Sequence, residues 1–235
     1  MARQKLGQHF LIKGSILERI AAAACPGTAG LNVVIEIGPG RGALTEKLLQ
    51  RAPRVIALEI DPYLVAHLRQ RFAGDPRLEV IEGDVLDIDL SQWGPAAIAG
   101  NLPYYITSPI LHQVSRIAFT RAVFLIQKEV AERLVAVPGT RDYGFLTVQT
   151  ALFATVRRLC DVKPSAFQPP PKVDSSVVLL EPRKADPGVA DPAAFVRFVG
   201  LCFSHKRKTI RNCLIETYGK EAIDGWPEAD RKSVV

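Results

Sequence analysis

The sequence predicts an α/β fold: a mostly parallel sheet covered by helices, with an antiparallel hairpin at its edge and a small helical domain after it. Strand-like and helix-like apolar patterns alternate regularly through residue 150, which is typical of α/β proteins. After Thr155, two strand-like segments follow each other without a helix between them. Residues 193–218 then have a helical pattern.

The first half of the chain contains local signals for the start of each element. A β-branched run over residues 32–37 predicts the first strand, and a glycine-rich turn separates it from a helix over residues 43–50. Asp61 followed by Pro62 is an N-cap followed by a first-turn proline, so the next helix is expected over residues 63–72. The other strands are expected over residues 54–58, 78–81, 96–99 and 122–127.

The second half contains a further helix start and then a change of pattern. Ser108 and Pro109 repeat the cap-and-proline arrangement and predict the start of the helix between the fourth and fifth strands. Residues 155–161 and 176–181 are joined by a proline-rich connection, and we expect them to form the antiparallel hairpin at the sheet edge. Residues 182–192 contain three prolines and are expected to be a linker.

This linker divides the chain into an expected α/β domain over residues 1–184 and a small basic helical domain over residues 185–235. Of the net charge of +6, residues 1–150 contribute +2 (16 cations, 14 acids) and residues 151–235 contribute +4 (14 cations, 10 acids). Five cations and no acid lie within residues 193–215. The excess indicates a polyanionic partner, although a basic run can also be a solvated face.

The composition is that of an ordinary folded protein. Its 235 residues, 48% hydrophobic and 23% charged, are enough for one sizeable core. No apolar run approaches the roughly 18 residues that cross a bilayer, so we expect no membrane partner and a cytoplasmic location. The four cysteines and four histidines lack metal-ligand spacing, so we expect no metal site.

A glycine-rich turn at residues 38–42 follows the first strand and precedes a helix, where a nucleotide-like ligand can approach the backbone. Gly38, Gly40 and Ala43 also satisfy the dinucleotide fingerprint, and Glu59 lies about 20 residues further on, where an acid accepts from ribose hydroxyls. At this point NAD and S-adenosylmethionine both remain candidate ligands.

Two features of the sequence favour S-adenosylmethionine over NAD. Asp84 follows the third strand and is placed to accept from an adenine amino group, with Val85 and Leu86 as apolar cover, although it can also be an Asx-turn residue. The tetrapeptide from Asn101 to Tyr104 follows the fourth strand, at the carboxyl edge where ligands bind in such sheets.

This tetrapeptide suits methylation of the amino group of a base. An exocyclic amine is a poor nucleophile because its lone pair is delocalised into the ring. If the Asn101 side-chain oxygen and the Leu102 carbonyl each accept one N–H, the lone pair is freed toward an electrophile. Pro103 would hold these acceptors, and the Tyr104 ring would stack on the base. The alternative is a simple turn with a half-buried tyrosine.

The chain resembles the KsgA-type ribosomal RNA adenine N6-dimethyltransferases, which have the Rossmann-like class I methyltransferase fold. The resemblance covers nearly the whole length. It rests on Asn101–Tyr104, Glu59, Gly83–Asp84 and four longer motifs: Gly7–Leu11, Glu36–Gly42, Phe167–Ser175 and Lys206–Asn212.

The resemblance implies transfer of two methyl groups from S-adenosylmethionine to each of two adjacent adenosines, in a hairpin loop near the 3′ end of 16S rRNA within the pre-30S subunit. It also implies a monomer with a role in late subunit assembly. The implied cofactor contacts are His9, Leu11, Gly38, Glu59, Asp84 and Asn101. The implied base pocket consists of Asn101, Leu102, Tyr104 and Phe167, with Phe167 facing Tyr104 across the flipped adenine.

The chain departs from the family pattern at two places. The family usually has asparagine at the position of His9, and it normally continues beyond Val235 with helical sequence that packs the small domain, so we expect this domain to be truncated. The resemblance also implies that cations of the tail neutralise rRNA phosphates; these are Lys206, Arg207, Lys208 and Arg211.

Three other functions are alternatives. The related 23S rRNA adenine methyltransferases of the macrolide-resistance type share much of the pattern, but Leu102 and the Lys206–Asn212 tail favour the small-subunit type. A non-catalytic assembly factor would not need an intact Asn101–Tyr104 tetrapeptide. An NAD oxidoreductase would need a hydride-acceptor site, and the sequence shows no evident one.

Overall fold

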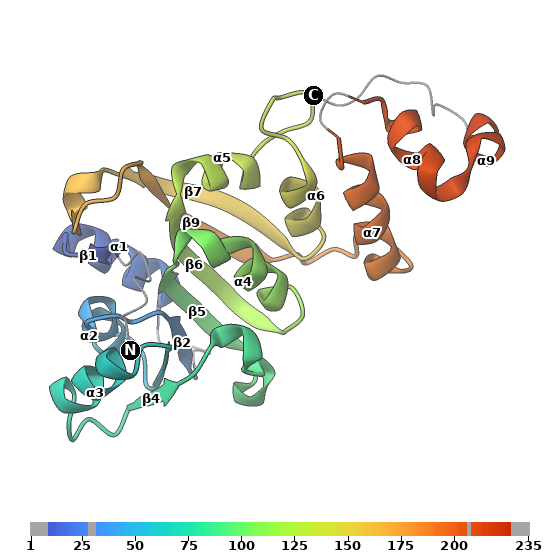
Figure 1. Ribbon diagram of the computed structural model, residues 1–235. Coiled ribbons are helices and arrows are strands. Elements are labelled where there is room, and N and C mark those ends of the chain that lie inside the picture. Colours follow the sequence, from blue (N-terminus) through green and yellow to red (C-terminus); the bar gives the residue numbers. More distant parts are fainter. Residues whose placement is uncertain (1–8, 28–31, 206–207, 227–235) are drawn as a thin grey trace. The chain divides into compact units, whose positions relative to one another are not determined.

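A computed structural model describes residues 9–27, 32–205 and 208–226 of the chain (Figure 1). The chain forms two compact units. The first consists of Met1–Ala131 and Thr155–Pro182, and the second of Glu132–Ala154 and Arg183–Val235. The break after Pro182 lies close to the boundary expected at residue 184. The segment Glu132–Ala154, expected within the α/β domain, belongs to the second unit.

The first unit contains a sheet that, in the described residues, has seven strands in the order β4-β3-β2-β5-β6-β9-β7. Neighbours from β4 to β6 pair in parallel, and β6 pairs with β9 antiparallel. The predicted α/β class is confirmed. The strands are β2 (Val34–Ile37), β3 (Val55–Glu59), β4 (Leu78–Glu82), β5 (Ala96–Asn101), β6 (Phe119–Gln127), β7 (Ala154–Val162) and β9 (Ser175–Pro182).

The predicted antiparallel pair lies at the β6 end of this sheet. The Thr155 hydroxyl donates to the Glu181 carbonyl at one end of β7, and the Ser176 hydroxyl donates to the Asp161 carboxylate at the other end. These contacts show that β7 and β9 run antiparallel. The later strand, β9, lies between β6 and β7, so β7 is the edge strand.

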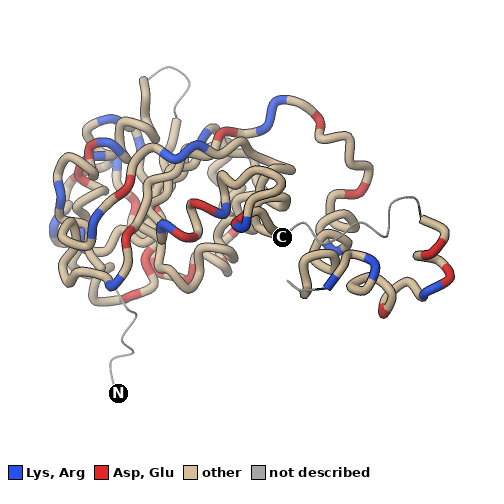
Figure 2. Tube along the Cα trace, turned by 90° about the horizontal axis from the view of Figure 1, so that it is seen from above, with Lys and Arg blue, Asp and Glu red and all other residues tan. Residues whose placement is uncertain are grey.

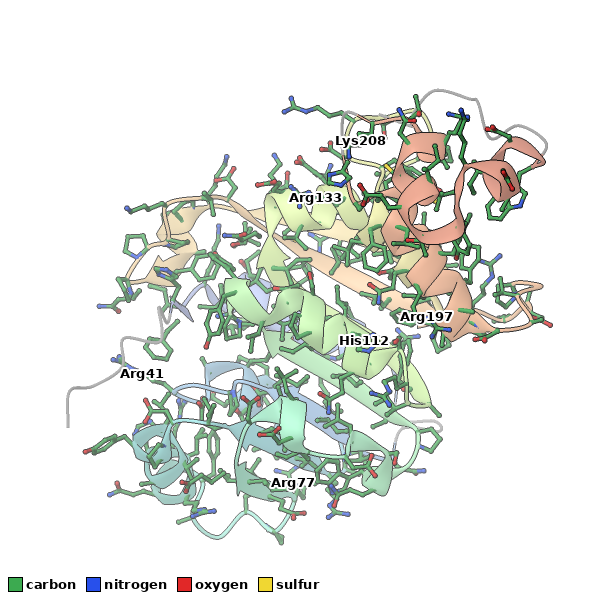
Figure 3. The ribbon with its side chains drawn as sticks, turned by 45° about the vertical axis from the view of Figure 1, so that its right-hand side comes forward. Arg41, Arg77, His112, Arg133, Arg197 and Lys208 are labelled. Atoms are coloured by element: carbon green, nitrogen blue, oxygen red, sulfur yellow. The ribbon has the colours of Figure 1, made fainter. Side chains whose placement is uncertain are left out.

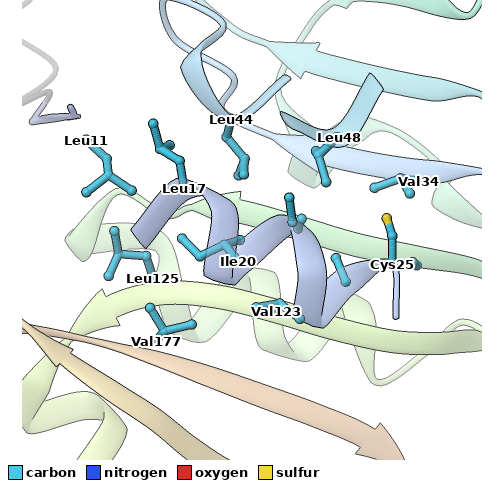
Figure 4. Packing of buried hydrophobic residues seen from close by; sticks show 14 of the residues in the cluster. Leu11, Leu17, Ile20, Cys25, Val34, Leu44, Leu48, Val123, Leu125 and Val177 are labelled. Atoms are coloured by element: carbon cyan, nitrogen blue, oxygen red, sulfur yellow. The ribbon is translucent and has the colours of Figure 1, made fainter. Parts of the chain in front are cut away.

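Helices of the first unit bury their apolar faces against the sheet. Ile20 and Leu17 of α1 lie in a core cluster with Leu48 of α2 and with Val123 and Leu125 of β6 (Figure 4). Burying one such side chain stabilises the fold by roughly 1.5–3 kcal/mol. The helices are α1 (Gly14–Ala24), α2 (Ala43–Leu49), α3 (Pro62–Arg71), α4 (Thr107–Val114) and α5 (Lys128–Leu134), which continues into the second unit.

One of the two predicted caps is confirmed. The Asp61 side chain accepts from the Tyr63 amide at the start of α3, with Pro62 in the first turn. The cap predicted at Ser108 is wrong, because α4 starts at Thr107, directly after a 3₁₀ turn (η3, Tyr104–Ile106). Since the chain enters α4 from this turn, Ser108 lies inside the first turn of the helix.

A second, two-stranded sheet was not predicted. Strand β1 (Phe10–Leu11) pairs antiparallel with β8 (Phe167–Gln168), which follows the 3₁₀ turn η4 (Pro164–Ala166). Strands of two residues have no measurable periodicity. This pairing ties the N-terminal segment to the proline-rich connection between β7 and β9.

The second unit is helical. The predicted helical stretch over residues 193–218 is divided into two helices, α7 and α8, with caps at Asp191 and Thr209 that accept from Ala194 and Asn212. None of the described helices is long and apolar enough to cross a membrane. The described helices of this unit are α6 (Phe145–Ala151), α7 (Pro192–Cys202), α8 (Ile210–Tyr218) and α9 (Lys220–Asp224).

Candidate active site

A pocket in the first unit lies at the carboxyl ends of the central parallel strands, where ligands bind in open α/β sheets. Strands β2, β3 and β5 contribute residues to it, as do the segments that follow β4 and β5. Four implied cofactor contacts, His9, Gly38, Glu59 and Asp84, share this pocket with the Asn101–Tyr104 tetrapeptide. The residues that line it are His9, Ile37, Gly38, Leu58, Glu59, Ile60, Gly83, Asp84, Val85 and Asn101–Ile106.

The glycine turn forms one wall because its backbone adopts conformations that other residues avoid. Gly38, Gly40 and Gly42 have φ angles of +67°, +58° and +82°. A side-chain carbon on Gly40 would lie 3.0 Å from the Phe10 ring. The turn therefore needs glycine at this position for close packing as well as for its φ angle. Arg41, on the same turn, lies over the Phe10 ring (Figure 3).

Glu59, at the end of β3, holds the glycine turn. Its Oε2 accepts from the Gly40 amide at 3.0 Å, and its Oε1 accepts from the amides of Ile60 and Asp61, both at 3.0 Å. The side chain is 4% exposed, and burial raises its pKa despite these hydrogen bonds. A carboxylate has about four acceptor positions, so Glu59 retains capacity for a ribose hydroxyl while it fixes the turn.

Asp84 caps the 3₁₀ turn η1 (Val85–Asp87), because its Oδ1 accepts from the Leu86 amide at 2.9 Å. This confirms the Asx-type role that the sequence left open. The carboxylate also lines the pocket beside the buried Val85. One oxygen can thus shape the loop while the other accepts from a ligand. A second 3₁₀ turn, η2 (Leu90–Trp93), completes the connection to β5.

Asn101 and Leu102 present two acceptors at the end of β5. The Asn101 Nδ2 donates to the His9 carbonyl at 2.8 Å, which fixes the side-chain amide. The Leu102 amide donates to the Leu125 carbonyl at 3.0 Å, and its side chain is 1% exposed. No described residue donates to the Asn101 Oδ1 or to the Leu102 carbonyl oxygen. Both oxygens belong to pocket-lining residues and are available to a ligand amine.

Tyr104 is fixed by residues that are distant in sequence. Its hydroxyl lies 2.9 Å from the Ser175 Oγ, and Ser175, at the start of β9, is fully buried. The His9 and Tyr104 rings lie nearly parallel, with centroids 6.1 Å apart. The His9 Nδ1 hydrogen-bonds to the Pro169 carbonyl at 2.8 Å. Burial raises the pKa of Tyr104, and the bond to Ser175 opposes this shift. The Tyr104 side chain is therefore neutral, and its ring is held in place at the pocket.

Three residues at or beside the pocket, Ser175, Ile60 and Tyr105, were not predicted from the sequence to have a role. Ser175 lies in the motif Phe167–Ser175, but its partner Tyr104 is 71 residues away in the chain. Ile60 follows Glu59 directly and is 47% exposed at the pocket. For Ile60, the sequence signal was its position directly after Glu59 at the end of a predicted strand. For Ser175, no sequence pattern indicates its contact with Tyr104.

Two residues that the family resemblance implies as contacts, Phe167 and Leu11, do not line this pocket. Phe167 is 3% exposed and lies in the core cluster with Leu17, outside the pocket. The side chains of β8 alternate, so Phe167 is buried and Gln168 is exposed. That Phe167 faces Tyr104 across a flipped base stays a prediction. Leu11, its partner on β1, is also in the core and lines a smaller cavity next to Gly38 and Asn101.

Glu36, on β2, lies beneath the glycine turn and lines the same smaller cavity. It is 1% exposed, its Oε2 has no hydrogen-bond partner among the described residues, and burial raises its pKa from 4.5 to about 8. The folded protein therefore holds a proton on Glu36 that the unfolded chain releases above pH 4.5.

We predict that Glu36 makes the protein less stable as the pH rises from about 4.5 to about 8. Its pKa is raised in the folded state, so its stabilising contribution is complete below its unfolded pKa and is lost through the folded pKa. Glu36→Gln should remove this loss. Urea unfolding of both proteins at pH 5, 7 and 8.5 checks it. The prediction fails if the difference in unfolding free energy between the two proteins is independent of pH.

The cations of the tail are only partly described. Lys206 and Arg207 lie outside the described residues. Lys and Arg residues occur along the trace of both units (Figure 2). Arg197 and Lys208 are exposed (Figure 3). The Arg211 guanidinium pairs with the Asp224 carboxylate, so its charge is partly neutralised within the unit.

Comparison with known proteins decides between the candidate functions. The ribosomal RNA adenine dimethylase family matches residues 1–230. The chain belongs to this family. It is 46% identical to the ribosomal RNA small subunit methyltransferase A of Acidobacterium capsulatum, over 95% of this chain and 81% of that protein. It is 41% identical to the protein of the same name from Synechococcus elongatus, over 95% of this chain and 85% of that protein.

Solved structures agree with this family and its fold. A dimethyladenosine transferase from Plasmodium falciparum superposes with a TM-score of 0.78 and 34% identity, over 92% of this chain and 78% of that chain. The 23S rRNA methyltransferase ErmE superposes with a TM-score of 0.73 and 30% identity, over 96% of this chain and 94% of that chain. The fold is therefore the Rossmann-like fold of class I methyltransferases, and the chain is an rRNA adenine dimethyltransferase.

The family uses S-adenosylmethionine, and the pocket fits it. The residues that line the pocket suit each part of the cofactor. The Glu59 carboxylate can accept from the ribose hydroxyls and the Asp84 carboxylate from the adenine amino group, while Ile60 and Val85 can cover the faces of the adenine ring. At Gly38 a side-chain carbon would meet only the Asn101 backbone oxygen, at 3.8 Å, so the backbone is open there to the part of the cofactor that bears the methyl group. No group of three or more residues able to hold a metal ion occurs in the described parts of the chain.

Proposed function

We propose that this protein transfers two methyl groups to N6 of each of two adjacent adenosines in a hairpin loop near the 3′ end of 16S rRNA. The observation that carries the proposal is the pair of unpartnered acceptors, Asn101 Oδ1 and the Leu102 carbonyl, beside the glycine turn. The names of the relatives from Acidobacterium capsulatum and Synechococcus elongatus support the small subunit as the target. The match to ErmE supports the 23S alternative less strongly, at 30% identity.

The cofactor is held by side chains of the pocket. Glu59 would accept from the ribose, Asp84 would accept from the adenine amino group, and Gly38 would allow close approach to the backbone. His9, Leu11 and Asn101 lie where the N-terminal segment meets the end of β5, and they would hold the methionine part of the cofactor. When bound, S-adenosylmethionine supplies an electrophilic methyl group on its sulfonium.

The chain's own residues activate the nucleophile. Asn101 Oδ1 and the Leu102 carbonyl each accept one N–H of the adenine amino group, so its lone pair turns toward the methyl group. The His9 carbonyl holds the Asn101 amide in the orientation that exposes Oδ1. Tyr104, fixed by Ser175, stacks on the flipped base. The nitrogen loses its proton to water after attack, so no strong general base is required.

The second unit binds rRNA phosphates through its basic segment, and the protein acts as a monomer in the cytoplasm, where the pre-30S subunit is assembled. The exposed Arg197 and Lys208, together with Arg207, supply the charge. Such contacts add affinity but little sequence specificity.

Arg207→Ala should weaken rRNA binding and reduce the slope of log K against log salt by about 0.7–0.9 per lost phosphate contact. Binding to small-subunit particles, titrated from low to high salt, checks this. Arg54→Ala is the matched control, because Arg54 is an exposed cation of the first unit that is already paired with Glu79 at 2.7 Å. A slope equal to that of the unaltered protein would place Arg207 on a solvated face.

Incorporation of labelled methyl groups into purified ribosomal particles tests the proposed function. Immature small subunits from cells that lack the modification should accept four methyl groups, mapped to two adjacent adenosines. Labelling of 23S rRNA would support the macrolide-resistance alternative. Tight binding to small subunits without any transfer would support a non-catalytic assembly factor.

A further inference from the structure

Two consecutive tyrosines at the pocket have opposite environments. Tyr104 is half-buried, and its hydroxyl is bonded to Ser175. Tyr105, the next residue of η3, is 65% exposed and lines the same pocket. In the described part of the chain, the side chain of Tyr105 has neither a hydrogen bond nor a ring contact. The fold therefore fixes one ring and leaves the next one free at the pocket.

The free ring has exposed apolar neighbours in this pocket and on the loop beside it. Ile60, after β3, lines the pocket and is 47% exposed; Leu86, next to the pocket residue Val85, is 39% exposed. Tyr105 and Ile60 thus expose apolar surface to water in one pocket. Apolar surface of this kind at a pocket marks a place where a ligand with a flat apolar face docks.

The substrate supplies such a face. When one adenine is flipped into the pocket, the neighbouring base loses its stacking partner, at a cost of a few kcal/mol. An aromatic ring beside the pocket can replace that lost contact. Stacking of a base on an aromatic side chain is sequence-tolerant, because every base has a π face.

We propose that Tyr105 stacks on the nucleobase adjacent to the target adenine and so determines how rRNA is held while one base is flipped. This inference rests on the proposed function. Tyr104 then contacts the reacting base, and Tyr105 contacts its neighbour. Since two adjacent adenosines are modified in turn, the base on Tyr105 in one round becomes the base in the pocket in another.

Steady-state methylation of small-subunit particles tests this with substitutions at one position. Tyr105→Leu keeps an apolar side chain but removes the π face, and it should raise KM for the particles roughly tenfold to a hundredfold. Tyr105→Phe keeps the ring and should stay within about twofold of the unaltered protein. The affinity for S-adenosylhomocysteine, measured by calorimetry, should not change for either variant. Tyr63→Leu is the control, because Tyr63 is 73% exposed but does not line the pocket.

Three results would overturn the proposal. KM for Tyr105→Leu equal to that of Tyr105→Phe would show that the π face is not used. A loss of S-adenosylhomocysteine affinity in Tyr105→Leu would assign the residue to the cofactor instead. An equal rise in KM for Tyr63→Leu would indicate a general surface effect. Failure of the unaltered protein to methylate the particles would instead contradict the proposed function.

Discussion

Asn101→Ala is expected to lower turnover about 100- to 1000-fold at saturating cofactor, with little change in rRNA affinity. The substitution removes one of the two acceptors that turn the amine lone pair toward the methyl group, an interaction that is strongest in the transition state. Loss of a single preorganised hydrogen-bonding group of this kind has that magnitude. Single-turnover rates with small-subunit particles measure it.

The Asn101 amide also donates to the His9 carbonyl, so two controls are needed. The melting temperature and the S-adenosylhomocysteine affinity of Asn101→Ala show whether the N-terminal segment stays in place. Gln70→Ala removes an exposed amide on α3 and should leave turnover unchanged. If Asn101→Ala turns over at the normal rate, the adenine amine is not activated by this side chain.

Glu59→Ala is expected to weaken S-adenosylmethionine binding about 100-fold and to destabilise the fold by about 2 kcal/mol. The substitution removes the ribose acceptor. It also leaves the Gly40 amide, in a turn with positive φ angles, without its Glu59 partner. Calorimetry with S-adenosylhomocysteine and urea unfolding separate the two effects.

Glu82→Ala is the matched control for Glu59. Glu82 lies opposite Glu59 in the register of β4 and β3, at the same carboxyl edge, but it is exposed and does not line the pocket. Its removal should change neither cofactor affinity nor stability appreciably. Equal affinity for cofactor in the Glu59 variant and the unaltered protein would remove Glu59 from the ribose site.

Elements with strong local signals could be predicted from the sequence. The first strand of the parallel sheet, β2, is a β-branched run, and the Asp61–Pro62 start of α3 is a local cap. The two-residue strands β1 and β8 carry no periodic signal, because their pairing depends on residues more than 150 positions apart. The Ser108 cap failed for a related reason, since the preceding 3₁₀ turn changes how the chain enters α4.

The candidate site was predictable where it depends on strand ends. Glu59, Asp84 and Asn101 follow parallel strands, so sheet topology alone brings them to one edge. The direction of the Phe167 side chain was not predictable, because it depends on the unpredicted pairing of β8 with β1. The bond between Tyr104 and Ser175 likewise depends on the antiparallel placement of β9 beside β6.

The division of the chain into units was only partly predictable. Proline content marks the linker before α7, and the break after Pro182 lies there. The segment Glu132–Ala154 has no comparable composition change at either end. Its place in the second unit is set by tertiary contacts, including those of α6 with α7.

A structure of the protein with S-adenosylhomocysteine and the 3′-terminal rRNA hairpin tests the activation of the amine by direct observation. The target adenine N6 should lie about 2.7–3.2 Å from both Asn101 Oδ1 and the Leu102 carbonyl oxygen, with its base against Tyr104. A flipped adenine whose N6 bonds to neither oxygen would contradict the mechanism, even if the RNA were bound and the cofactor product occupied the pocket.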